Sequence, residues 1–68
     1  MHDNVYFAEK EFVSGRYRYA VKYCEYALAR EPDDVSAWLL LAKSLIQLND
    51  IIGGVDAFEN AALLSPLS

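Results

Sequence analysis

Hydrophobic residues in this chain recur at steps of three and four, which is the spacing of one face of an α-helix. The clearest run lies in the second half, where this face comprises Trp38, Leu41, Ala42, Leu45 and Leu48. Asn49 and Asp50 then signal a turn, and a second apolar face follows, with Val55, Phe58, Ala61 and Ala62 before a stop at Pro66. The second half therefore predicts two helices joined by a tight turn.

The first half has the same helix, turn, helix pattern. Ser14 and Gly15 supply the turn, and Gly15 is suited to end a helix. Asp34 or Ser36 can cap the helix that begins the second half. The buried face of the helix after the first turn comprises Ala20, Val21, Cys24, Ala27 and Leu28. We therefore predict an all-α chain with helices near residues 3–13, 17–30, 35–48 and 51–64.

The two halves are related by a fixed shift, since the length of 68 residues is twice 34. A shift of 34 gives five identities, which pair Ala8 with Ala42, Val21 with Val55, Glu25 with Glu59, Ala27 with Ala61 and Pro32 with Pro66. Small residues meet small residues, and both halves end in a proline at the same phase. We therefore expect one domain, 1–68, built from repeats 1–34 and 35–68.

A known family shares this residue order. Trp38, Leu41, Ala42, Leu45, Gly54, Phe58, Ala61 and Pro66 resemble the pattern of a tetratricopeptide repeat. The first half matches it through Phe7, Ala8, Gly15, Tyr17, Ala20, Ala27 and Pro32, and departs from it at Asn4 and Glu11. The resemblance implies two helix-turn-helix hairpins stacked as a short right-handed superhelix of four antiparallel helices.

The resemblance also implies a function. Tetratricopeptide repeats are not enzymes and need no cofactor; they stack into a superhelix whose concave groove binds segments of partner proteins, as scaffolds or adaptors do. The groove positions carried over to this chain are Val5, Glu9, Phe12, Leu39, Lys43 and Ile46. Opposite charges on Glu9 and Lys43 could pair across the groove floor. We expect such a groove to bind an apolar or amphipathic segment; the alternative is that these residues pack against neighbouring helices.

One branch of the family is excluded by the same positions. Chaperone-binding members hold a C-terminal carboxylate with lysine, arginine and asparagine side chains. Val5, Glu9 and Leu40 stand at matching positions here. A carboxylate facing these groups would be left unpaired and costly to bury. We therefore do not expect this chain to bind a chaperone C-terminus.

A second surface is suggested on the helix near 17–30. Tyr19, Tyr23, Tyr26 and Arg30 follow one another at steps of four, three and four, on a stripe expected to face away from Ala20, Cys24 and Ala27. Tyrosine and arginine are enriched among interface anchors. The alternatives are ordinary surface tyrosines or packing against a preceding helix.

Composition narrows the function classes. Six Lys and Arg stand against ten Asp and Glu, for a net charge of -4, which argues against binding to nucleic acid or to an anionic membrane. The longest apolar stretch, 37–42, is too short to enter a membrane as a span. A lone Cys24 and no signal peptide favour the cytoplasm, with the nucleus as an alternative. His2 has no partner at metal-ligand spacing, and no acid, base and nucleophile occur together, so we expect neither a metal site nor an enzyme.

The end of the repeat pattern raises the question of assembly. Repeat arrays need polar capping elements, and none follows the last predicted helix. Val55, Phe58, Ala62, Leu63 and Leu64 should therefore be partly uncovered. We expect this uncapped C-terminal hairpin to be covered by a second copy, by another protein or by more of a larger solenoid. The competing hypothesis for function is thus a structural subunit with no exchangeable ligand.

Overall fold

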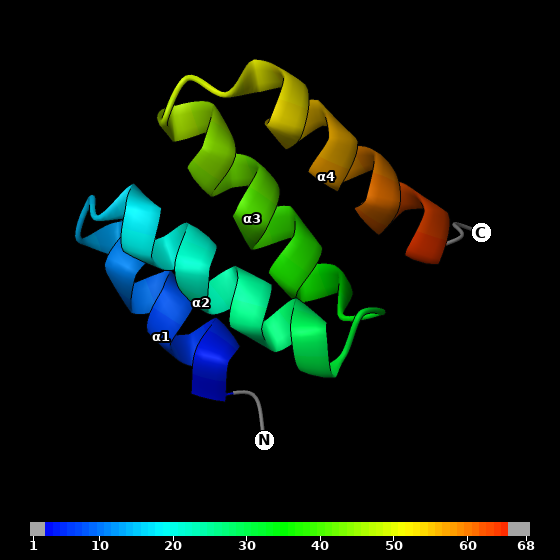
Figure 1. The fold of residues 1–68 in the computed structure, drawn as a ribbon, viewed down its shortest axis with the longest axis horizontal. Coiled ribbons are helices and arrows are strands. Elements are labelled where there is room, and N and C mark those ends of the chain that lie inside the picture. Colours follow the sequence, from blue (N-terminus) through cyan, green and yellow to red (C-terminus); the bar gives the residue numbers. More distant parts are fainter. Residues whose placement is uncertain (1–2, 66–68) are drawn as a thin grey trace.

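The computed structural model describes residues 3–65, apart from the side chain of Asp3, and this range contains four helices and no strand. They are α1 (Asp3–Val13), α2 (Tyr17–Arg30), α3 (Val35–Gln47) and α4 (Ile51–Leu64) (Figure 1). The prediction of an all-α chain with four helices is confirmed. The third helix ends one residue before the expected position, because Leu48 is its C-cap. The expected stop at Pro66 and the lone His2 lie outside the described residues.

The helices form two hairpins that stack on each other. α1 packs against α2, α3 packs against α4, and α2 packs against α3 (Figure 1). α3 therefore lies between α2 and α4, whereas α1 and α4 each have a side that no helix covers. This difference between inner and outer helices determines which side chains are exposed.

The turn inside each hairpin is built in the same way. Gly15 has φ of 82° and Asn49, 34 positions later, has φ of 68°. The backbone N–H of Arg16 donates to the carbonyl oxygen of Glu11 at 2.8 Å, and the backbone N–H of Asp50 donates to the carbonyl oxygen of Leu45 at 2.9 Å. Glycine and asparagine are the residues that most readily adopt this left-handed conformation. The backbone pattern of the turns thus repeats with the 34-residue shift found in the sequence.

Each helix of the second hairpin begins with a side-chain cap. Asp34 accepts a hydrogen bond from the N–H of Ala37 at 3.1 Å, and Asp50 accepts one from the N–H of Gly53 at 3.0 Å. These carboxylates satisfy backbone donors that have no partner inside the helix. The loop before α3 is held by the indole of Trp38, whose Nε1–H donates to the carbonyl of Pro32 at 2.8 Å.

Small side chains occupy the centre of the molecule. Ala8, Ala20, Cys24 and Ala42 are completely buried, as is Ser44, whose hydroxyl donates to the carbonyl of Leu40. Cys24 and Ser44 are the largest side chains that are fully buried. Small residues let helix axes approach closely, which explains their spacing in the sequence. The larger apolar residues are placed around this centre, and many of them reach the surface.

Candidate protein-interaction surfaces

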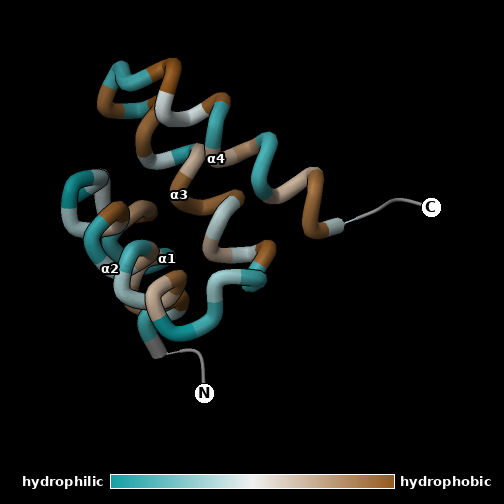
Figure 2. The backbone as a smooth tube through the Cα atoms, turned by 45° about the vertical axis from the view of Figure 1, so that its right-hand side comes forward, coloured by the Kyte–Doolittle hydropathy of each residue, from teal (hydrophilic) through white to brown (hydrophobic). Residues whose placement is uncertain are grey.

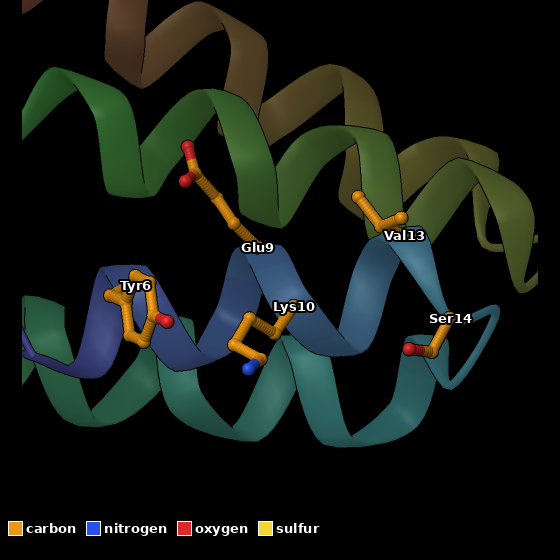
Figure 3. Close-up of a pocket in the computed structure, with 5 residues that line it drawn as sticks. All are labelled: Tyr6, Glu9, Lys10, Val13 and Ser14. Carbon is orange, nitrogen blue, oxygen red and sulfur yellow. The ribbon is translucent and has the colours of Figure 1, made fainter.

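The six predicted groove residues, which we call the inner face, lie on α1 and α3 as the sequence suggested. Glu9 and Lys43 are exposed, and the Glu9 side chain points from α1 toward α3 (Figure 3). Leu39 is also exposed, whereas Val5 is half-buried. In the described part of the chain no ion pair joins Glu9 to Lys43, in contrast to the expected pairing. Both charges therefore remain available to a partner.

Phe12 and Ile46, the remaining two members of the inner face, are half-buried inside their own hairpins. The ring of Phe12 lies 5.3 Å from that of Tyr17, and Phe12 packs against the core. Ile46 faces Gly54 so closely that a Cβ on this glycine would lie 2.5 Å from its Cγ1 atom. Both residues follow a small residue by four positions, so they share its face and pack with it. The exposed part of the inner face is therefore Leu39, Lys43 and Glu9.

An apolar groove runs between α3 and α4. It has a volume of about 370 Å³, and we call it the C-terminal groove; its lining residues are Val35, Leu39, Phe58, Ala61, Ala62 and Ser65. Leu39 belongs to both this groove and the inner face. Phe58 and Ala62 are exposed here, and Leu63 and Leu64 are exposed on the same helix. Hydrophobic residues occur at both ends of α4, where the tube is brown in Figure 2.

A second hollow lies on α1, on the side that no helix covers. It has a volume of about 350 Å³ and is lined by Tyr6, Glu9, Lys10, Val13 and Ser14 (Figure 3). Val13 is largely exposed. The ammonium group of Lys10 lies 5.5 Å from the centre of the Tyr6 ring, close enough for a cation–π interaction.

Aromatic rings continue from this hollow across α1 and α2. The ring of Tyr6 lies 5.5 Å from that of Phe7, Phe7 lies 5.6 Å from Tyr23, and Tyr23 lies 6.4 Å from Tyr26. We call these four residues the aromatic face. Tyr6, Phe7 and Tyr26 are each about half exposed. Aromatic residues on an accessible surface are typical anchors of protein interfaces.

A comparison with known families agrees with this architecture. A family model described as tetratricopeptide repeat matches residues 12–51, which is 40 of the 68 residues and includes all of α2 and α3. The chain belongs to the tetratricopeptide repeat family. Comparisons with curated proteins and with solved structures gave no match. The general role of this family is protein–protein interaction, and its repeats are generally not catalytic.

The tyrosine stripe predicted on α2 of this tetratricopeptide protein is only partly a surface. Tyr19, Tyr26 and Arg30 are exposed. Tyr23 is half-buried and packs against the core, so the expectation that the whole stripe faces away from the buried side of α2 was wrong for this residue. Sequence reasoning missed Tyr6 and Phe7, which complete the aromatic face. The repeat offered a signal for them, because Tyr6 and Phe7 stand 34 positions before Leu40 and Leu41, which pack between helices.

The first tetratricopeptide hairpin contains one buried thiol, that of Cys24. Burial raises the pKa of the Cys24 thiol to about 12, and the carboxylates of Asp34 and Glu25 add to the shift. A thiol with such a pKa is neutral at physiological pH and is a poor nucleophile. Among residues 3–65 no group of three or more His, Cys, Asp or Glu is placed to hold a metal ion. None of the described helices has the length and hydrophobicity needed to cross a membrane.

Proposed function

We propose that this chain is a protein-interaction module whose inner face binds an apolar or amphipathic segment of another protein, as a scaffold or adaptor does. Family membership supports protein binding in general. The observation that supports the inner face is that Leu39, Glu9 and Lys43 are all exposed and that the two charges do not pair with each other.

The chemistry of these residues defines the segment that fits best. Leu39 continues into the C-terminal groove, so apolar side chains of a partner would find continuous apolar surface there. Lys43 and Glu9 would then select a segment that carries an acidic and a basic residue. A hydrogen bond to a charged group contributes about 1.5–3 kcal/mol when water is excluded, so the two charges favour orientation and specificity. A highly charged tail would lack apolar contacts on this surface.

A displayed library of random 12-residue peptides tests the proposal without a known partner. We expect enrichment of peptides with apolar residues flanking one charge of each sign. Binding of the enriched peptides, measured by fluorescence anisotropy, should weaken at least about tenfold in Lys43→Glu and in Leu39→Glu. Lys22→Glu, at an exposed position on α2, is the matched control and should bind normally. Absence of enrichment, or peptides that bind Lys43→Glu as well as the native chain, would refute the inner face as the binding site.

A structural subunit without an exchangeable ligand is the second candidate, because α1 and α4 each leave apolar residues exposed. Lys43→Glu distinguishes the candidates, since the Lys43 side chain is exposed and lies outside the C-terminal groove. Ile46 is unsuitable for this purpose, because it packs against Gly54 and a charged residue there would damage the hairpin. If the chain is only a subunit, the native chain should select no peptide, whereas a module should select peptides whose binding Lys43→Glu weakens.

A further inference from the structure

The 34-residue repeat allows the same positions to be compared inside the molecule and at its ends. On α3, Leu40 and Leu41 are each only 8% exposed, because they belong to the core cluster that includes Cys24 of α2. The equivalent residues of α1 are Tyr6 and Phe7, which are 56% and 45% exposed. α1 therefore presents to solvent the positions that α3 uses to pack against the first hairpin.

The surface that receives α3 inside the chain has an uncovered equivalent on α4. In the first hairpin Cys24 is completely buried and Leu28 packs against the same core cluster as Leu40 and Leu41. The residues 34 positions later are Phe58 and Ala62, and both are exposed in the C-terminal groove. The second hairpin thus leaves open the surface on which the first hairpin seats α3.

We propose that copies of this chain associate head to tail, with α1 of one copy seated in the C-terminal groove of the next. Tyr6 and Phe7 would take the places that Leu40 and Leu41 have inside the chain. The internal junction between the hairpins is the template for this contact, because it joins the same two sets of positions. This argument favours a second copy over an unrelated helix, since one chain carries both halves of the interface.

At one pair of positions in the proposed contact the side-chain sizes compensate, whereas Phe58 is larger than its equivalent Cys24. Ala62 is smaller than its equivalent Leu28, which widens the groove. Phe7 is larger than its equivalent Leu41 and would fill the added space. Phe58 would meet the rings of Tyr6 and Phe7, and aromatic pairs stabilise a contact by more than their buried area alone.

At one pair of equivalent positions, α1 has a charged residue where α3 has none. Lys10 stands where α3 has the buried Ser44. The long stem of a lysine can carry its ammonium group to the edge of an interface. α4 contains two acidic residues, Asp56 and Glu59, and no basic one, so the receiving helix has the opposite charge.

Such a contact joins two different surfaces and does not close by itself, so it should build open chains of copies. Sedimentation equilibrium of the native chain should show an average mass that rises with concentration beyond that of a dimer. Tyr6→Glu blocks the inserted helix and Ala62→Arg blocks the groove. Both positions are exposed, and glutamate and arginine favour helix, so the fold should be retained in circular dichroism. Each variant alone should associate at least about tenfold more weakly than the native chain.

Mixing the two variants gives the decisive result. The native groove of Tyr6→Glu can accept the native α1 of Ala62→Arg, so the mixture should form a dimer that stops at two copies. A chain that carries both Tyr6→Glu and Ala62→Arg should remain monomeric. The proposal is wrong if the native chain stays monomeric up to roughly millimolar concentration, or if the mixture of single variants forms no dimer. Lys43→Glu should associate normally, which separates this test from that of the inner face.

Discussion

Gly54 offers a direct test of how α3 and α4 are packed. A Cβ added to this glycine would lie 2.5 Å from Cγ1 of Ile46 and 3.2 Å from the carbonyl oxygen of Ala42. Replacing a helical glycine by alanine normally stabilises a protein by about 0.5–1 kcal/mol. Forcing an extra carbon into a filled interface costs about 1–3 kcal/mol. We therefore expect Gly54→Ala to lower the free energy of unfolding by about 1–2 kcal/mol, with the packing term exceeding the helix term.

A double-mutant cycle separates the two terms. Ile46→Ala removes the Cγ1 atom that a new Cβ would meet, and it lowers stability by itself because Ile46 is half-buried. In that background Gly54→Ala should become neutral or stabilising by up to about 0.5–1 kcal/mol, because mainly the helix term remains. The coupling between the two sites should then be about 1–3 kcal/mol.

Urea unfolding followed by circular dichroism measures all four proteins of the cycle. Protein concentration must be the same throughout, because association would add to the apparent stability. Equal effects of Gly54→Ala in both backgrounds would show that Ile46 does not limit the approach of the helices. If Gly54→Ala raised the free energy of unfolding of the native chain, the packing argument would be wrong.

Three further predictions concern the turns, the loop and the core. Gly15→Ala should lower the free energy of unfolding by about 1 kcal/mol, because Gly15 has φ of 82° although an added Cβ would meet no neighbour. Gly15→Asn should lower it clearly less, because Asn49 adopts the same conformation in the equivalent turn. Equal losses for the two variants in urea unfolding would contradict this prediction. Trp38→Phe should lower the free energy of unfolding by about 0.5–1.5 kcal/mol through loss of the hydrogen bond to Pro32, and an unchanged unfolding midpoint would argue against that bond. Because the pKa of the folded Cys24 thiol is raised to about 12, its contribution to stability is complete below the unfolded pKa of about 8.5 and is lost as the pH rises toward 12. The stability of the native chain relative to Cys24→Ala should decline over this interval, and a thiol reagent at pH 8 should react with the native chain only on unfolding; fast reaction in the folded state would refute the burial argument.

The backbone of this protein could be predicted almost completely from its sequence, because the signals for it are local. The turn residues, the cap at Asp34 and the small residues at Ala8 and Ala42 each fix one feature of a hairpin. A 34-residue repeat then supplies the turns and the small residues twice, although Arg16 gives α2 no side-chain cap where Asp50 caps α4. The only difference in the helix bounds was one residue at the end of α3.

The candidate site was less predictable, because it depends on how far each helix is rotated against its neighbour. Phe12 and Ile46 lie four residues after Ala8 and Ala42, and they turn into the hairpins with them. That relation was present in the sequence, but a register carried over from the family assigned both residues to the groove. Tyr23 was misplaced for a different reason, since its contact with Phe7 joins two helices and no local spacing reports it.

The distribution of large side chains connects the fold to the proposed assembly. Two hairpins with the same backbone turns differ in what covers them. α3 is enclosed by α2 and α4, and its Leu40 and Leu41 are buried, while Tyr6 and Phe7 at the same positions of α1 are not. Nothing in the backbone distinguishes these two positions, so the difference in burial comes from the neighbours alone. The centre of this small fold contains Leu40 and Leu41, but its completely buried side chains are no larger than Cys24 and Ser44, so the apolar area that it buries is limited. Burying Tyr6, Phe7 and Phe58 between copies would add the apolar contacts that the centre lacks, and association that requires the folded state stabilises that state.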